Sequence, residues 1–402
     1  MDSSFPQEIL KKSLDQHQDI VKIRRRLHMM PEIGHEEHET SKYLAVEMQR
    51  IGLDVVEGIA GTGVVGILRG NFPGETVALR ADIDALPLDE ENDIPYKSRN
   101  KGCMHACGHD SHMAMLLGSA RILIQYRERL NGNVKFIFQP AEELAPYGGA
   151  QAMISEGVLE NPEVTGIFGL HNWPELPSGD LGVRTGYILA ANDFIRLNII
   201  GKGGHGAILE EAVNPVYLAA EVLIEAQSLV DKIEDSLKPA LISIPFIRAG
   251  FTYNVVPEQA VLEGSVRYLN PDAGPIIRQQ LDQMASSLCQ SAGGSSQLEY
   301  KFGYPALYND QKMTSLVGKV ATDLLGEKKV HLQAPPTMVS DDFAHYSREV
   351  PGCYFLLGNR NPDKGIVHSL HSTRFNVDED ILPLGSAIFA DVALRFLGVA
   401  EE

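Results

Sequence analysis

Cysteine is scarce in this chain of 402 residues, which has only Cys103, Cys107, Cys289 and Cys353. Four thiols in a chain of this length do not make the disulfide scaffold of a small secreted protein. Long apolar runs are missing as well, because no stretch approaches the roughly 18 residues of a membrane-spanning helix. The first residues also lack a basic segment followed by an apolar one, the pattern of a secretory signal. These absences predict a cytoplasmic protein without a membrane partner.

Positive charge is in short supply too. The chain has 35 Lys and Arg against 53 Asp and Glu, which gives a formal net charge of -18. Nucleic-acid binding needs a basic face that neutralises phosphates, so we expect no nucleic-acid partner. Hydrophobic residues make up 44% and charged residues 22% of the chain, an ordinary globular composition. At roughly 100–200 residues per domain, the length predicts two or three domains.

Helical and strand patterns alternate through the first part of the chain. Helical apolar spacing covers residues 7–28, 36–51 and 112–130, and short β-branched runs cover residues 62–68, 76–81, 134–138 and 166–170. The alternation returns near the C-terminus, with a helix at 311–325, a strand at 353–357 and a helix at 379–397. This arrangement is typical of a layered α/β domain with a mixed sheet.

A different order interrupts that alternation. Strand, helix, two strands, helix and strand are predicted in turn at residues 194–200, 215–230, 241–247, 254–268, 275–291 and 297–302. This β-α-β-β-α-β order is typical of an open-faced α+β sandwich. We therefore expect a first domain made of residues 1–188 and 305–402, with a second domain inserted at residues 189–304.

The densest group of potential metal ligands is HACGHDSH at residues 105–112. Side chains two residues apart do not share a helix face, so Cys107 and His109 can converge only on a loop or at a helix start, where the glycine between them permits the turn. A thiol just ahead of a helix N-terminus is expected to have a lowered pKa, which favours the thiolate that binds metals. His105 and His112 are weaker candidates, equally suited to packing or to supporting a ligand.

Further candidates follow the ends of predicted strands, where open α/β sheets place their active sites. They are Asp84, the adjacent pair Glu142 and Glu143, and His171, while His371 lies in a polar loop before the last helix. Of two adjacent carboxylates, one can bind a metal while the other faces the water that the metal activates. Asp84 is a candidate to support a ligand, with a salt bridge to Arg80 as its structural alternative.

Together these residues form a mixed set of sulfur, nitrogen and oxygen donors. The five proposed ligands are Cys107, His109, Glu143, His171 and His371. Such a set suits two divalent cations that share a bridging ligand. Zinc and manganese are the first expectations, and cobalt and nickel are also tolerated by these donors.

Three residues of the inserted domain are candidates for contacts with a substrate. His205 lies in the glycine-rich turn at 201–207, where a bland turn is the alternative. Asn254 offers an amide donor, and Arg267 offers a planar guanidinium that suits a carboxylate. Both are equally compatible with structural roles.

In this order the motifs resemble the hippurate hydrolase, indole-acetyl-amino-acid hydrolase and N-acyl-amino-acid amidohydrolase branch of the aminoacylase and carboxypeptidase superfamily (metallopeptidase family 20). The resemblance runs nearly end to end. It covers residues 25–28, 31–34, 79–87, 105–112, 139–143, 171, 201–207, 254–257 and 371.

The resemblance implies an enzyme that hydrolyses N-acyl-L-amino acids or short peptides. The acyl group would be acetyl, benzoyl or a similar group. Residues 1–188 and 305–402 would form a catalytic domain holding two metals, with Glu142 as general base. The inserted domain would be a lid and a surface for a homodimer. His205 would stabilise the oxyanion, while Asn254 and Arg267 would grip the substrate carboxylate.

Three positions depart from the family pattern. Gly206-Ala207-Ile208 follows His205 where two small residues and a nearby proline are usual, Asp341 stands for a glutamate, and Asn214 stands for an aspartate. None removes a predicted ligand.

Three alternatives remain. The same site would serve a carboxypeptidase or dipeptidase. Cys107 could instead be the nucleophile of a metal-free thiol hydrolase. The third alternative is a catalytically silent, metal-binding regulatory protein.

Overall fold

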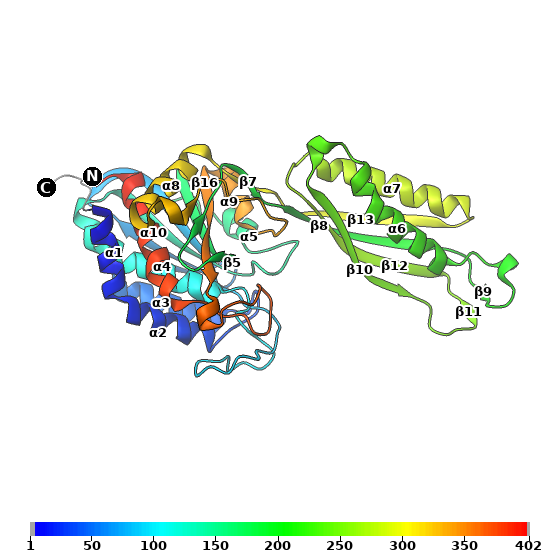
Figure 1. The fold of residues 1–402 in the computed structure, drawn as a ribbon, viewed down its shortest axis with the longest axis horizontal. Helices are drawn as coiled ribbons and strands as arrows, with labels where there is room; N and C mark the ends of the chain where they lie inside the picture. The colour runs from blue at the N-terminus through cyan, green and yellow to red at the C-terminus, as the bar shows by residue number, and fades with distance from the viewer. Residues whose placement is uncertain (1–4, 400–402) are drawn as a thin grey trace.

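The computed structural model describes residues 5–399, and a mixed sheet of eight strands organises its larger part (Figure 1). In spatial order the strands are β1 (Asp54–Ile59), β2 (Gly63–Arg69), β4 (Asn131–Gln139), β3 (Phe72–Asp82), β5 (Gly166–Pro177), β16 (Gly352–Arg360), β6 (Leu181–Gly182) and β15 (Val330–His331). The central strands β4, β3, β5 and β16 pair in parallel, while β1 and β2 pair antiparallel at one edge. The predicted layered α/β domain with a mixed sheet is confirmed.

Helices cover both faces of this sheet, and a separate apolar core lies under each layer. One layer contains α1 (Phe5–Asp15), α2 (His17–His28), α3 (His38–Ile51), α4 (His109–Leu123), α8 (Gln311–Leu325) and α10 (Leu382–Leu397). The other contains the short helices α5 (Ala150–Ser155) and α9 (Phe343–Glu349). Successive strand residues point to opposite faces, so Leu79 belongs to the first core and Ala78 to the second.

Helix α4 lies in the middle of the first layer. Every one of its residues except Arg121 is buried, because it packs against α2, α10 and the sheet. A helix enclosed on all sides is held in a single position. Its first turn, which carries His109 and His112, is therefore fixed beneath the edge of the sheet.

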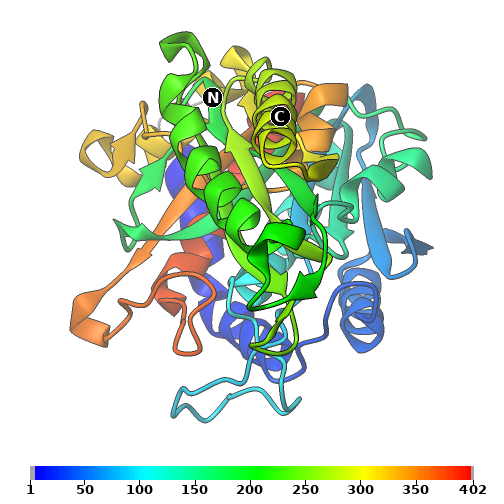
Figure 2. The same cartoon turned by 90° about the vertical axis from the view of Figure 1, so that its right-hand side faces the viewer.

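The inserted part is a four-stranded antiparallel sheet with two helices on one face. Its main elements are β8 (Ala191–Ile200), α6 (Pro215–Lys232), β10 (Ala240–Ala249), β12 (Gln259–Tyr268), α7 (Ala273–Ser291) and β13 (Ser295–Tyr304). The two helices and alternate strand residues form one core. Figure 1 shows this part projecting from the larger part, and Figure 2 views it from its far end. The element order matches the predicted β-α-β-β-α-β pattern.

Several element boundaries differ from the sequence-based expectation. The helix predicted at 7–28 is two helices that break at Gln16, whose side chain donates a hydrogen bond to the carbonyl of Gly118. The strand predicted at 254–268 divides into β11 (Val255–Val256) and β12, with Pro257, which has no N–H to donate, between them. The helix predicted from residue 112 already begins at His109.

Among residues 5–399, no helix has both the length and the apolar character needed to cross a membrane. The strands and helices of the inserted part fall between residues 191 and 304. The domain boundaries at 188/189 and 304/305 stay predictions.

Candidate active site

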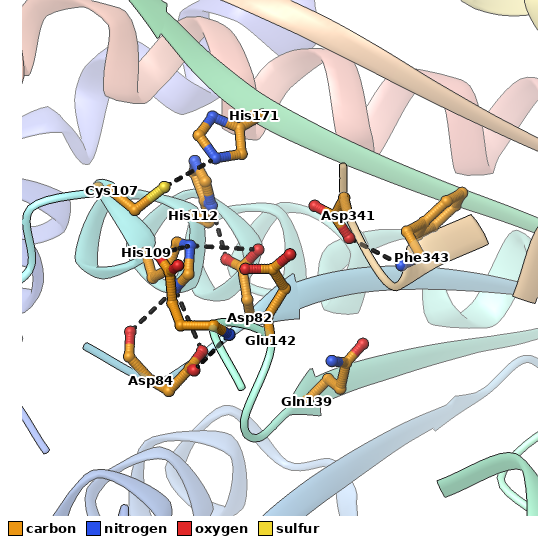
Figure 3. Close-up of polar contacts among 12 residues, drawn as sticks. Asp82, Asp84, Cys107, His109, His112, Gln139, Glu142, His171, Asp341 and Phe343 are labelled. Atoms are coloured by element: carbon orange, nitrogen blue, oxygen red, sulfur yellow. Dashed lines mark hydrogen bonds and ion pairs between the residues drawn. The ribbon is translucent and has the colours of Figure 1, made fainter. Parts of the chain in front are cut away.

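The predicted site residues of the larger part lie near one edge of its sheet. Strands β3, β4 and β5 are parallel neighbours, so their carboxyl ends meet there. Asp84 follows β3, Glu142 and Glu143 follow β4, and His171 lies in β5. His109, the first residue of α4, and Cys107, two residues before it, come to the same place (Figure 3).

The five predicted ligands form one cluster. One donor atom each from Cys107, His109 and His171 lie within 4.8 Å of one another, and the same holds for Cys107, Glu143 and His371. Cys107 Sγ is 3.3 Å from His171 Nε2. Glu143 Oε1 is 3.3 Å from His371 Nε2. Cys107 therefore belongs to both groups.

Hydrogen bonds to backbone carbonyls orient two of the imidazoles. His109 Nδ1 lies 2.9 Å from the carbonyl oxygen of Asp84, and His171 Nδ1 lies 2.6 Å from that of Asn172. A carbonyl oxygen only accepts, so Nδ1 carries the proton in both rings. Nε2 is therefore the ring atom that each histidine turns toward the cluster, as in metal-binding histidines. Despite burial, Asp82 and Asp84 raise the pKa of His109 to about 10, so a cation would displace a proton from its Nε2.

Asp84 supports this arrangement through its carboxylate as well. Its Oδ1 is 3.3 Å from His109 Nδ1, and its Oδ2 accepts a hydrogen bond of 2.8 Å from the backbone N–H of Glu143. The alternative salt bridge with Arg80 is not formed, because Arg80 pairs with Asp82, Asp341 and Asp342 instead.

His105 and His112, the two weaker candidates, differ in their contacts. His112 Nδ1 is 2.7 Å from Asp82, and its Nε2 accepts from the backbone N–H of Asn172, so both of its nitrogens are engaged (Figure 3). Both ring nitrogens of His105 are buried without a hydrogen-bond partner among residues 5–399, and His105 belongs to none of the donor groups found there. Asn172 is a site residue that the sequence analysis missed. Its side chain also donates to the carbonyl of Cys107 at 2.9 Å.

The cluster has the properties of a cation site. His109 Nε2 and Glu143 Oε1 are buried with no hydrogen-bond partner in the described part of the chain, although buried polar atoms usually have one. Burial, with Glu143 and Glu142 nearby, raises the pKa of the Cys107 thiol well above its usual range. This contradicts the lowering expected at the helix start, since desolvation and adjacent carboxylates outweigh the helix dipole. A divalent cation would supply the missing positive charge. A thiol that coordinates such a cation is deprotonated, because the cation stabilises the thiolate.

Glu142 lies next to the donors. Burial raises the pKa of its carboxyl well above the usual range, and Asp341 and Glu143 raise it further. The hydroxyl of Tyr304, at the end of β13, donates a 2.7 Å hydrogen bond to the Glu142 carbonyl. Enzymes commonly raise the pKa of a carboxyl group that serves as a general acid or base.

The cluster opens into a cavity of about 730 Å³ between the two parts of the molecule. Its apolar walls include Trp173, Leu189, Leu241, Met338, Val339 and Leu370. Arg267 of β12 also lines it and donates a 2.8 Å hydrogen bond to the carbonyl of Met338. Trp173 follows His171 by two residues on β5, a spacing that places both on one side of a strand and would have identified it.

His205 and Asn254 lie elsewhere. They lie at the short antiparallel pairing of β9 (Gly204–His205) with β11, at the far end of the inserted part (Figure 1). Arg267 and Gln259 are eight residues apart on β12, which at ~3.3 Å per residue separates the pocket from this end by about 26 Å. Asn254 and Arg267 of one chain are therefore too far apart to hold the same carboxylate.

The three departures have local structural roles. Asn214 caps α6 by accepting from the N–H of Val216. Asp341 is buried and accepts from the N–H of Phe343 and the hydroxyl of Tyr354. Gly206 donates to the carbonyl of Asn254, next to the pairing of β9 with β11.

Known proteins match this chain over most of its length. Residues 78–395 match the model of peptidase family M20/M25/M40. The chain is 37% identical over 392 residues to thermostable carboxypeptidase 2 of Saccharolobus solfataricus, covering 97% of this chain and 98% of that protein. It is 36% identical over 384 residues to N-acetylcysteine deacetylase of Bacillus subtilis, covering 95% and 97%. IAA-amino acid hydrolase ILR1-like 4 of Arabidopsis thaliana is also 36% identical over 384 residues, covering 94% and 86%.

A solved structure agrees with these similarities. The Bacillus subtilis YXEP protein, described as a dinuclear metal binding peptidase, superposes with a TM-score of 0.82 at 32% identity, covering 95% of this chain and 98% of that one.

Proposed function

Because this chain belongs to peptidase family M20/M25/M40, we propose that it is a two-metal amidohydrolase that cleaves N-acyl-L-amino acids to a carboxylate and a free amino acid. It is a hydrolase of amide or peptide bonds, as its relatives are. The observation that carries the proposal is the convergence of four buried or partly buried donors and the exposed His371 beside Glu142 at a cavity.

Two divalent cations would be held by Cys107, His109, Glu143, His171 and His371, with Cys107 common to both. The mixed donors support this, as do His109 Nε2 and Glu143 Oε1, neither of which makes a hydrogen bond among residues 5–399. When bound, such cations polarise the amide carbonyl and lower the pKa of a water molecule. Zinc or manganese is our first expectation, with cobalt or nickel as substitutes.

Glu142 would act as the general base and then as the general acid. It would take a proton from the attacking water and deliver it to the leaving amine. The raised pKa of its carboxyl fits both halves of that task. Asp84 would keep His109 and Glu143 in place through its contacts with both.

Arg267 would bind the substrate carboxylate at the other side of the cavity. Its guanidinium is partly buried, and the bond to Met338 engages only Nη1 in the described chain and leaves other donors for a ligand. The apolar walls around Trp173 suit an acyl group or an apolar side chain.

His205 and Asn254 would reach a cavity from a second copy of the chain. The distance of about 26 Å along β12 between Arg267 and this end of the inserted part supports a homodimer in which the β9–β11 strand pair of one chain meets the pocket of the other. Near the β9–β11 strand pair, Phe251 is 86% and Tyr253 99% exposed, which supports an apolar contact there. In this arrangement His205 would stabilise the oxyanion.

The carboxypeptidase or dipeptidase alternative uses the same chemistry, and the similarity to a thermostable carboxypeptidase favours keeping it. The thiol-hydrolase alternative fits poorly. Burial raises the pKa of Cys107 and lowers that of His171, so the pair does not favour a thiolate and an imidazolium. A cytoplasmic location and the absence of nucleic-acid and membrane partners stay predictions.

Replacing Glu142 by Gln tests the assignment of the base. The variant keeps the five donors, so we expect normal metal content and a fall in kcat of about 10²–10⁴-fold. Release of amino acid should be followed with N-acetyl and N-benzoyl amino acids beside unblocked dipeptides. Near-normal turnover by the variant would sink this role for Glu142. Faster cleavage of dipeptides by the unmodified protein would favour the dipeptidase alternative.

A further inference from the structure

The segment between α2 and α3 lies against the turn that carries Glu142 and Glu143. Gly34 touches that turn so closely that a Cβ at this position would come within 3.0 Å of the Ala141 Cα. Residues 31–34 of this segment are among the motifs of the family resemblance, yet the proposed reaction gives them no role. The contacts of Glu37, at the end of the same segment, suggest what it does.

Glu37 is a completely buried carboxylate, with 0% of its surface exposed. Its Oε1 accepts a 2.8 Å hydrogen bond from the backbone N–H of Ala141. Its Oε2 accepts a 2.6 Å hydrogen bond from the hydroxyl of Thr62. Burying a carboxylate is costly unless it is well partnered, so these contacts call for a reason.

Capping of α3 does not supply that reason. Glu37 occupies the N-cap position of this helix, but its side chain makes no capping hydrogen bond. Glu32 does this work, since its carboxylate accepts from the N–H groups of Thr40 at 2.8 Å and Glu39 at 3.2 Å. The Glu37 carboxylate is therefore directed away from its own helix and toward the turn.

Ala141 needs an external restraint. Its φ is +58°, in the left-handed region that a residue with a Cβ rarely adopts. Such conformations persist only where the surroundings hold them. Three consecutive residues of the turn have one backbone anchor each: Ala141 N–H is held by Glu37, the Glu142 carbonyl by Tyr304, and Glu143 N–H by Asp84.

We propose that Glu37 is a positioning residue, whose carboxylate holds the Ala141 turn in the conformation that directs Glu142 to the reacting group and Glu143 to the donor cluster. The effect on turnover rests on the proposed function. The effect on the turn itself does not, because it follows from the hydrogen bond to Ala141 alone.

Turnover tests the first effect. Glu37→Ala should lower kcat by about 10- to 100-fold with little change in KM, since a displacement of about 1 Å in a catalytic group costs this much. Glu37→Gln should stay within about threefold of the unmodified protein, because its amide oxygen can still accept from Ala141 while its NH2 donates to Thr62. Glu37→Asp keeps the charge but is one methylene too short, so it should resemble Glu37→Ala and serves if that variant folds poorly.

Glu32→Ala is the matched control. It removes the carboxylate that caps α3 from the same segment, so it should lower the melting temperature while kcat stays unchanged. A loss of turnover in Glu37→Ala that merely reflected damage to this segment would also appear in Glu32→Ala.

Hydrogen–deuterium exchange tests the second effect without any turnover. The peptide covering residues 139–145 should exchange faster in Glu37→Ala than in Glu37→Gln, because the Ala141 N–H loses its acceptor. If the unmodified protein cleaves no amide, the proposed function fails while this exchange result still stands. Unchanged kcat in Glu37→Ala, unchanged exchange, or a Glu37→Gln variant as slow as Glu37→Ala would each overturn the positioning role.

Discussion

Cys107 joins the two donor groups that together contain all five proposed ligands. It belongs to both donor groups, one with His109 and His171 and one with Glu143 and His371. Its thiol is buried, and carboxylates beside it raise its pKa. A side chain in this position is stable as a thiolate only when positive charge is supplied, which is why the two proposed cations should depend on it together.

Replacing Cys107 by Ser should therefore remove more metal than replacing a residue that only supports a ligand. Loss of a partner such as Asp84 typically costs about 10–100-fold in metal affinity, and Cys107→Ser should exceed that for both cations and abolish turnover. Cys103→Ser is the control, because Cys103 is also buried but belongs to none of the donor groups among residues 5–399. Elemental analysis after desalting measures the outcome. A Cys107→Ser protein that keeps two metals per chain would contradict a shared ligand.

The sequence predicted the metal-binding donors better than the residues that hold them in place by hydrogen bonds. Cys107 and His109 are close in sequence, and Glu143 and His171 follow strand patterns, so their convergence could be inferred. Asn172, Tyr304 and Glu37 act through contacts with segments between 65 and 162 residues away. No local pattern encodes such pairings, because they depend on how the loops meet after folding.

At the scale of elements, parallel strands account for most of the site. β3, β4 and β5 end at one edge of the sheet, and the enclosed helix α4 presents its first turn there. The alternation of strands and helices was enough to predict this from sequence. The pairing of β9 with β11 was not predictable in the same way, because strands of two residues carry no periodicity.

The β9–β11 strand pair, which carries His205, gives a test of the proposed homodimer. Removing an oxyanion donor costs about 10²–10³-fold in kcat, so His205→Ala should be nearly inactive, as should Glu142→Gln. If His205 acts across the dimer, a mixed dimer has one complete site, formed by Glu142 of one chain and His205 of the other. Co-expressed in equal amounts, the two inactive variants should then recover about a quarter of normal activity.

A control separates this recovery from residual activity. Glu142→Gln co-expressed with the double variant Glu142→Gln, His205→Ala contains no chain with the base, so its activity should stay at the background level. If the first mixture also stays at background, His205 either acts within its own chain or takes no part.

At the scale of the whole molecule, the cavity of about 730 Å³ depends on both parts. The larger part supplies the donors and Glu142, and the inserted part supplies Arg267, which is bonded to the carbonyl of Met338 across the boundary. The sequence predicted two parts and their fold classes but not their relative placement, because nothing in the local patterns records a distance of about 26 Å along β12. Because of that distance, His205 and Asn254 are candidates for contacts with the cavity of a second copy of the chain.

The central claim is that two cations at this cluster enable amide hydrolysis, and a stoichiometric metal titration tests it most directly. Protein stripped with a chelator would receive manganese or zinc in increments, and amino acid release from an N-acyl amino acid would be measured at each step. Trp173, the only tryptophan, lies with its ring centroid 5.9 Å from that of His171, so its fluorescence reports binding independently of turnover. We predict no activity after stripping and full recovery at two equivalents per chain. Activity that survives metal removal, or binding of two equivalents without any hydrolysis, would contradict the account.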